Sequence, residues 1–196
     1  MGPRSAESKL KMRDSERQCL GKSPVGCVIP DLLYIGPASK AASMVFLRTE
    51  GISRILSIGK SPPKVFEMEI DTPQGPRQLK YERLPLLDSE NIDITPCVDK
   101  AISIIDNAAA SGEKVLVHCS AAISRSPTVA AAYLMRCRGR TLQESLDTLI
   151  KARSVISPNP NFLHQLSNME KEIFGEQRTM VVTLRGQKIE LKDGNL

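Results

Sequence analysis

The feature that most constrains the fold is an apolar run, a polar loop and a helical segment that follow one another between residues 114 and 138. Residues 114–117, KVLV, are β-branched and apolar and predict a buried strand. Residues 127–138, PTVAAAYLMRCR, carry apolar side chains at helical spacing, and Pro127 suits a first turn, where no backbone donor is needed. The residues between them, HCSAAISRS, therefore form a tight loop that joins a strand to the start of a helix.

Such a loop contains the residue types that hold a phosphate and attack it. Inward-pointing loop amides and the positive end of the following helix form a site for a phosphate dianion. The same field lowers the pKa of the Cys119 thiol, which makes Cys119 a thiolate nucleophile at neutral pH. Arg125 presents a planar fork of donors that matches two phosphoryl oxygens. The alternative is a buried structural cysteine before a helix, but apolar packing explains neither His118 nor Arg125.

The other loop residues support these two. His118 precedes the nucleophile and is expected to orient the loop through its ring nitrogens. Ser126 is expected to hydrogen-bond the sulfur and ease its departure. The phosphate is expected to contact the residues between them, namely Ser120, Ala121, Ala122, Ile123, Ser124 and Arg125.

The stretch resembles the active-site signature of the dual-specificity branch of the cysteine-dependent protein phosphatases, usually written HCxxGxxRS. Three further segments resemble that family in the same order: the first strand (IPDLLYIG, 29–36), the strand and loop that carry the general acid (YERLPLLD, 81–88) and the PNxxFxxQL signature of the last helix (158–166). The resemblance covers about residues 27–175. It implies a small, atypical dual-specificity phosphatase without an added targeting domain.

The resemblance also implies a reaction and its acid. Asp88 lies in the loop where the family carries its proton donor, before a helix expected to begin near Thr95. Cys119 would attack phosphorus while Asp88 protonates the leaving oxygen, and Asp88 would then deprotonate the water that hydrolyses the phosphocysteine. Asp93 is a second candidate for the general acid. The alternative is that Asp93 stabilises the start of the following helix. The implied enzyme is a protein phosphatase for phosphotyrosine, phosphoserine and phosphothreonine.

One residue departs from the family signature. Ala122 stands where the signature has glycine. If that position needs a left-handed backbone, alanine costs about 1 to 2 kcal/mol, which puts the rate in question rather than the mechanism. Ala122 is also the support for one alternative function, an inactive relative that binds phosphoproteins. The other alternative is a phosphatase for a non-protein phosphate ester.

Alternating α and β patterns predict an α/β fold with a mostly parallel central sheet, helices on both faces and ligand chemistry beyond the carboxyl ends of the strands. We expect a basic, flexible N-terminal arm (1–26), a phosphatase-like catalytic domain (27–175) and a C-terminal extension (176–196) whose pattern indicates a β-hairpin. Arg153 is expected to be a cation at a helix C-terminus, with a place near the pocket as the alternative. Within the domain we predict helices at 39–50, 95–110, 141–153 and 160–175, a strand at 52–58 and mostly loop at 61–76, which has four prolines and a glycine.

Composition limits cofactors and partners. Two His and five Cys without ligand or framework spacing indicate no metal and no cofactor and, with no secretory signal recognised, a cytoplasmic and/or nuclear location. No apolar run reaches the length of a membrane span, and no aromatic platform suits single-stranded nucleic acid. The uncharged loop favours a phosphorylated protein as the partner, for example a kinase in signalling, over an inositol lipid, and the net charge of +5 favours such acidic partners over nucleic acid. The small size implies a shallow pocket, and the oligomeric state is left open.

Overall fold

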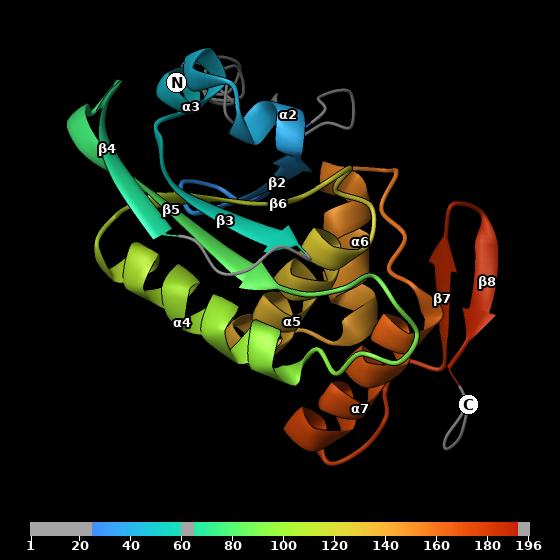
Figure 1. Ribbon diagram of the computed structural model, residues 1–196. Coiled ribbons are helices and arrows are strands. Elements are labelled where there is room, and N and C mark those ends of the chain that lie inside the picture. The colour runs from blue at the N-terminus through green and yellow to red at the C-terminus, as the bar shows by residue number, and fades with distance from the viewer. Residues whose placement is uncertain (1–24, 60–64, 192–196) are drawn as a thin grey trace, which may run out of the picture.

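The computed structural model describes residues 25–59 and 65–191, so the predicted N-terminal arm lies, except for its last two residues, outside the described part. Figure 1 shows a central sheet with helices above and below it. The described elements are β1 (Gly26–Ile29), β2 (Leu33–Pro37), α2 (Ala38–Ala41), α3 (Met44–Glu50), β3 (Ile52–Gly59), β4 (Val65–Thr72), β5 (Gly75–Pro85), α4 (Thr95–Ala110), β6 (Lys114–Cys119), α5 (Arg125–Arg138), α6 (Leu142–Ala152), α7 (Pro160–Phe174), β7 (Val181–Leu184) and β8 (Gln187–Glu190).

The main sheet has six strands in the order β1-β2-β6-β3-β5-β4. Strands β2, β6, β3 and β5 are mutually parallel, whereas β1 and β4 pair antiparallel at the two edges. The predicted mostly parallel α/β sheet is therefore confirmed. Because the carboxyl ends of parallel strands meet at one edge, the loops that follow β6 and β5 lie close together.

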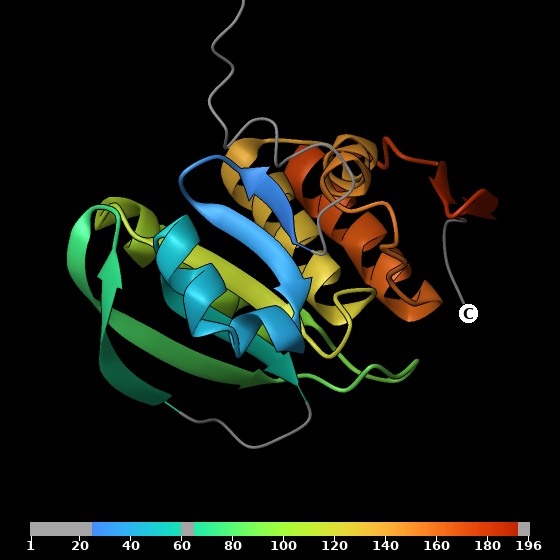
Figure 2. The ribbon, with the colours of Figure 1, turned by 90° about the horizontal axis from the view of Figure 1, so that it is seen from above.

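Helices cover both faces of this sheet, as predicted. Figure 2 shows α2 and α3 lying over one face, with the remaining helices of the domain beyond it. The larger hydrophobic core lies under α4–α7, where residues 129–135 of α5 are completely or almost completely buried. A smaller core, centred on Tyr34, Leu47 and Ile55, lies under α2 and α3. No helix in the described residues is long and apolar enough to span a bilayer.

The predicted helix at 39–50 is wrong in its extent, because the structure has two short helices there. The Ser43 hydroxyl accepts a hydrogen bond from the Phe46 N–H at 3.3 Å, so Ser43 caps a new helix instead of continuing the first. Gly51 ends α3 in the left-handed conformation, as the sequence indicates. The segment at 29–36 likewise contains a turn at Asp31, whose φ is 60°, between β1 and β2.

The predicted loop at 61–76 is also wrong for the part that the structure describes. Strand β4 pairs with β5 from Val65↔Glu82 to Thr72↔Gly75, which makes a hairpin. The prolines within the hairpin fall at its margins, since Pro73 lies in the turn and Pro76 at the start of β5. The acidic residues Glu67, Glu69 and Asp71 alternate with apolar ones along β4, which suits the edge strand that it forms.

The local signals for the later helices are confirmed. The helix predicted at 95–110 is α4, and the helix predicted at 141–153 is α6, which begins with a capping box of Thr141 and Glu144. The Asn159 side chain accepts from the Phe162 N–H and caps α7, which ends at Gly175.

The C-terminal residues form a hairpin, β7–β8, where the sequence predicts one, with positive φ at Arg185 and Gly186. Its buried residues join the main core, so the hairpin packs on the domain beside α6 and α7 (Figure 1). The fully buried Glu170 carboxylate also holds it in place. Glu170 accepts from the N–H groups of Leu142, Arg178 and Thr179 and from the Thr179 hydroxyl.

Candidate active site

The strand β6 delivers Cys119 to the start of α5, and the sulfur is buried among hydrogen-bond donors. The residue is 4% exposed, and Ser126 Oγ donates to Cys119 Sγ at 3.4 Å. Burial acts to raise the pKa of Cys119. The Ser126 hydroxyl, the backbone N–H groups of Ser126 and Ala122 and the charge of Arg125 outweigh burial and hold that pKa below the ordinary thiol value. The loop therefore favours the thiolate.

Arg125 begins α5 and lies against both Ser120 and Asp88. Its Nη2 donates to Ser120 Oγ at 3.2 Å, and its Nε lies 3.7 Å from Asp88 Oδ2. That second distance is too long for a hydrogen bond, and the buried Nε has no hydrogen-bond partner in the described structure. Arg125 thus keeps unused donor capacity beside the sulfur.

The carbonyl groups of the loop are tied to the surrounding elements. Arg153 donates through Nε to the Ala122 carbonyl at 3.2 Å and through Nη2 to the Ala121 carbonyl at 2.9 Å. Backbone N–H groups bind two more loop carbonyls, Ser157 to Ile123 at 2.7 Å and Ala38 to Ser120 at 3.1 Å. Because these carbonyl groups point outward to Arg153 and to backbone N–H groups, the loop N–H groups can point inward, toward a bound phosphate.

Arg153 is the C-cap of α6, as predicted. Its side chain, however, contacts the phosphate loop and donates to the two loop carbonyls. Its guanidinium is a support of the phosphate loop.

Ala122 has φ of 53°, in the left-handed region, and is fully buried. The position therefore does require the conformation that favours glycine. Alanine nevertheless adopts it, with its N–H on the Cys119 sulfur and its carbonyl on Arg153.

His118 orients the end of β6 through one ring nitrogen. Its Nδ1 lies 3.2 Å from the Cys119 carbonyl oxygen, so Nδ1 carries the proton that is donated there. Burial lowers the pKa of His118, the nearby charge of Arg83 lowers it further, and the bond to the Cys119 carbonyl acts in the opposite direction. The net decrease keeps the imidazole neutral at neutral pH.

Asp88 follows β5 and is fixed by the first turn of α7 and by the loop. Its Oδ1 accepts from Ser124 Oγ at 2.7 Å and from Asn159 Nδ2 at 2.8 Å. Ser124 Oγ in turn accepts from the Asn159 N–H at 3.2 Å. One short network therefore joins the candidate acid, the phosphate loop and the last helix.

Two amides of α7 hold the rest of the acid loop. Asn161 Nδ2 donates to the carbonyls of Ser89 and Ile92 at 3.3 and 3.0 Å. Gln165 Nε2 donates to the Ile92 carbonyl at 2.7 Å, while Gln165 Oε1 accepts from the Ile94 N–H at 2.9 Å. The signature residue Gln165 and its neighbour Asn161 thus hold the loop that carries Asp88.

Asp93 does not join Asp88 at the site. Its Oδ1 accepts from the Thr95 N–H at 2.8 Å, and hydrogen bonds to Thr95 lower the pKa of this exposed carboxyl. The helix-start interpretation of Asp93 therefore fits the structure. No group of three His, Cys, Asp or Glu side chains in residues 25–59 and 65–191 is arranged to hold a metal ion.

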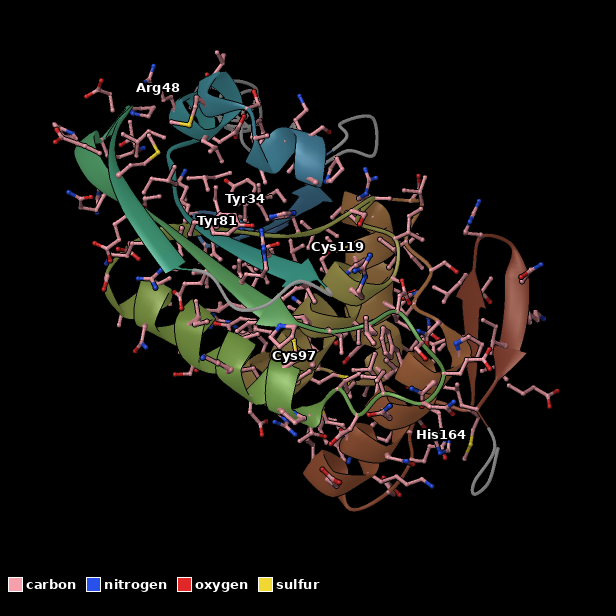
Figure 3. All side chains as sticks on the ribbon, in the orientation of Figure 1. Tyr34, Arg48, Tyr81, Cys97, Cys119 and His164 are labelled. Carbon is pink, nitrogen blue, oxygen red and sulfur yellow. The ribbon has the colours of Figure 1, made fainter. Side chains whose placement is uncertain are left out.

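The phosphate loop opens into a cavity of about 1010 Å³. Cys119, Ser120 and Arg125 line one end, and the remaining walls come from α2, α3, β3, β4, β5 and the Asp88 loop. Figure 3 shows Cys119 at the end of the strands and Tyr81 farther back along the sheet, toward α3. The short helices α2 and α3 and the sheet face beside them both contribute to the walls of the cavity.

Sequence reasoning brought Cys119, Arg125 and Asp88 together correctly in space but missed several of their partners. Asn159 caps α7, and its side chain also binds Asp88, 71 positions away. Arg153 lies 31 positions from the loop carbonyl it holds. The PNxxFxxQL motif was the one available signal for the α7 contacts.

Comparison with known proteins gives a consistent result. The family model for the dual specificity phosphatase catalytic domain matches residues 33–172. Dual specificity protein phosphatase 5 of Homo sapiens is 37% identical over 141 residues, which are 72% of this chain and 34% of that protein. Dual specificity protein phosphatase 1-A of Xenopus laevis is 36% identical over 141 residues, 72% of this chain and 36% of that protein. The chain thus spans little more than a third of the length of these relatives.

Solved structures resemble the chain over most of their own length. Human DUSP28 superposes with a TM-score of 0.65 at 27% identity and covers 79% of this chain and 97% of its own. A mouse putative dual specificity phosphatase, complexed with zinc tungstate, gives a TM-score of 0.63 at 28% identity, with 80% and 95% coverage.

Proposed function

The chain belongs to the dual specificity phosphatase catalytic-domain family, and on that premise we propose that it is a cysteine-dependent protein phosphatase for phosphotyrosine, phosphoserine and phosphothreonine. The observation that carries the proposal is the assembly of three groups on one loop system. A buried sulfur is surrounded by donors, an arginine has spare donors beside it, and a carboxylate stands against that arginine.

In the first step the phosphate dianion binds the loop amides and the Arg125 guanidinium. Cys119 Sγ attacks phosphorus in line, and the bond from phosphorus to the ester oxygen breaks. Asp88 gives its proton to that oxygen. Oδ1 of Asp88 already accepts from Ser124 and Asn159, so Oδ2 is the oxygen that carries the proton.

In the second step water attacks the phosphocysteine and the bond from sulfur to phosphorus breaks. Asp88, now ionised, takes the proton of the water, while Ser124 and Asn159 hold its Oδ1 in place. The Ser126 hydroxyl stabilises the departing thiolate. Inorganic phosphate then leaves, and the loop returns to its starting state.

The same proposal includes the setting of the reaction. A phosphorylated protein, for example a kinase, is the substrate in cytoplasmic or nuclear signalling. The net charge of +5 supports acidic, phosphorylated partners. No disulfide joins the four cysteines within the described residues, which is compatible with a reducing compartment.

The test compares wild type with Cys119→Ser on p-nitrophenyl phosphate and on tyrosine- and threonine-phosphorylated peptides. Wild type should turn over all three, and Cys119→Ser none. Equal rates for the two proteins would show that the chain is an inactive domain that binds phosphoproteins without hydrolysing them. Turnover of p-nitrophenyl phosphate and a non-protein ester, with no turnover of either peptide, would favour a phosphatase for a non-protein phosphate ester.

The acid is tested with Asp88→Asn and a matched control, Asp93→Asn, which changes a neighbouring carboxylate in the same way. Asp88→Asn should lower turnover of a phosphothreonine peptide by about 10² to 10⁴ and that of an activated aryl phosphate by less, because only a poor leaving group needs protonation. Asp93→Asn should leave both rates near those of wild type. Equal losses on the two substrates would show that Asp88 is not the acid.

A further inference from the structure

The cavity behind the phosphate loop contains a cation that the proposed reaction does not use. Most of its far wall is apolar, formed by Met44, Leu47, Ile55, Met68 and Leu79. Arg83, from β5, also lines it and is only partly exposed.

The sheet register places Arg83 at a defined distance from the nucleophile. Ser57 of β3 pairs with Arg83 on one side and with His118 on the other, so the three residues form one row across β5, β3 and β6. Neighbouring strands lie about 4.8 Å apart, which puts the Arg83 backbone about 10 Å from that of His118. Cys119 is the next residue. The charge of Arg83 also contributes to the lowered pKa of His118, which places the guanidinium within electrostatic reach of the site.

Arg83 is oriented by a neighbour but has no counter-charge. Its Nη2 donates to Tyr81 Oη at 3.3 Å, and its guanidinium carbon lies 5.9 Å from the centre of the Tyr81 ring. Among the described residues, no carboxylate forms an ion pair with Arg83.

Three other cations of the main sheet, Arg54, Lys80 and Lys114, are paired with carboxylates. Arg54 pairs with Glu82 and Glu113, and Lys80 also pairs with Glu113. A partly desolvated cation that faces a cavity without an anion is a site that a ligand anion can complete.

We propose that Arg83 is a specificity residue that binds a second anionic group of the phosphoprotein, a carboxylate or a second phosphate, while the first phosphate occupies the loop at Cys119. The proposal rests on the proposed protein phosphatase activity. An extended peptide covers 10 Å in about three residues, so the second anion lies within about three residues of the phosphoresidue. The apolar wall then contacts the side chains between the two charges.

The experiment uses phosphotyrosine peptides that differ at one flanking position. Gln, Glu and phosphoserine are placed in turn at each position within about three residues of the phosphotyrosine. The kcat/KM of each anionic peptide is divided by that of its Gln partner, so that a general loss of activity cancels. Wild type is compared with Arg83→Gln and with Arg77→Gln. Arg77 lies on the same strand and loses the same charge, but it does not line the cavity.

We expect wild type to prefer an anionic peptide at one position by about tenfold, as befits a charge-assisted contact. Arg83→Gln should bring the ratio close to one, whereas Arg77→Gln should keep it. The Glu and phosphoserine arms identify which anion is bound. In Arg83→Glu, a peptide with Lys at the same position should become the better substrate, which a merely structural role of Arg83 would not produce.

Four results would overturn the inference: no preference at any position in wild type, a preference that survives in Arg83→Gln, an equal loss in Arg77→Gln, or failure of Arg83→Glu to favour the Lys peptide. Failure of the underlying activity looks different, because wild type would then be no faster than Cys119→Ser on every peptide.

Discussion

Replacing Ala122 by glycine tests whether the alanine side chain lowers the stability of the domain or its rate of catalysis. Ala122 has φ of 53° and is fully buried. A non-glycine residue in this region costs about 1 to 2 kcal/mol, and Ala122→Gly removes that strain. The substitution also takes away one buried methyl group, at about 0.8 kcal/mol, and gives the unfolded chain extra freedom at about 0.4 to 1 kcal/mol.

These opposing contributions are similar in size, so we expect the free energy of unfolding to change by less than about 1 kcal/mol, or about 2 to 4 °C in Tm. The rate should change little as well. The Ala122 carbonyl is already held by Arg153, and the Ala122 N–H already reaches the Cys119 sulfur. We therefore expect kcat/KM to stay within about threefold of wild type, which corresponds to about 0.7 kcal/mol of barrier.

Urea unfolding and p-nitrophenyl phosphate kinetics measure the two quantities on the same preparations. Ala122→Val is the control, because a β-branched side chain in the left-handed region of a filled site should destabilise by about 2 to 4 kcal/mol. A gain in kcat/KM of more than about tenfold in Ala122→Gly would refute the reasoning, since alanine would then be holding the loop away from its working geometry. A tolerated Ala122→Val would show that the backbone conformation is not enforced.

Three more substitutions probe the support of the site. Ser126→Ala removes a hydrogen bond that lowers the pKa of Cys119, so the acid limb of the kcat/KM profile should move to higher pH, because activity is lost as the pH falls through that pKa. Arg153→Leu frees two loop carbonyls, and we expect vanadate affinity and kcat/KM to fall by about tenfold or more, with a smaller effect on Tm. Arg125→Lys keeps the charge but loses the fork, so vanadate affinity and rate should fall together, as measured by inhibition and steady-state kinetics.

Each of these three has a clear contrary result. An unshifted acid limb in Ser126→Ala would mean that another donor sets the thiolate. Undiminished vanadate binding in Arg153→Leu would show that the loop keeps its shape unaided. For Arg125→Lys, wild-type affinity for vanadate would exclude Arg125 as the clamp.

The parts of the fold that were predictable from sequence are those whose signals lie within a few residues. Thr141 and Glu144 specify the start of α6 by binding each other's backbone, three positions apart. Asn159 specifies the start of α7 in the same local way. Where two local signals compete, the sequence misleads. The prolines around β4 outweighed its alternating pattern, and Ser43 broke a helix that apolar spacing alone would continue.

The site divides along the same line. Cys119 and Arg125 belong to one short loop, so strand, loop and helix patterns place them together. Asp88 was found only because its segment resembles a known family. The contacts of Arg153 and Asn159 with the site could not be foreseen, because they join segments that become neighbours only after the sheet and α7 have assembled. Nor could the place of Arg83 beside the site be foreseen before the register of β5 and β3 was known.

The carboxylate of Glu170 determines how far the stable unit extends along the chain. The family match ends at residue 172, but three of the four donors to Glu170 come from Arg178 and Thr179. A chain cut after Gly175 would leave Glu170 with one of these donors and would remove Val182, Leu184 and Leu191 from the main core, at a cost of several kcal/mol. The residues that perform the chemistry end in the first turns of α7, whereas the cooperative folding unit continues through the hairpin. Deleting the tail would therefore abolish activity by unfolding the domain, without touching a single residue of the site.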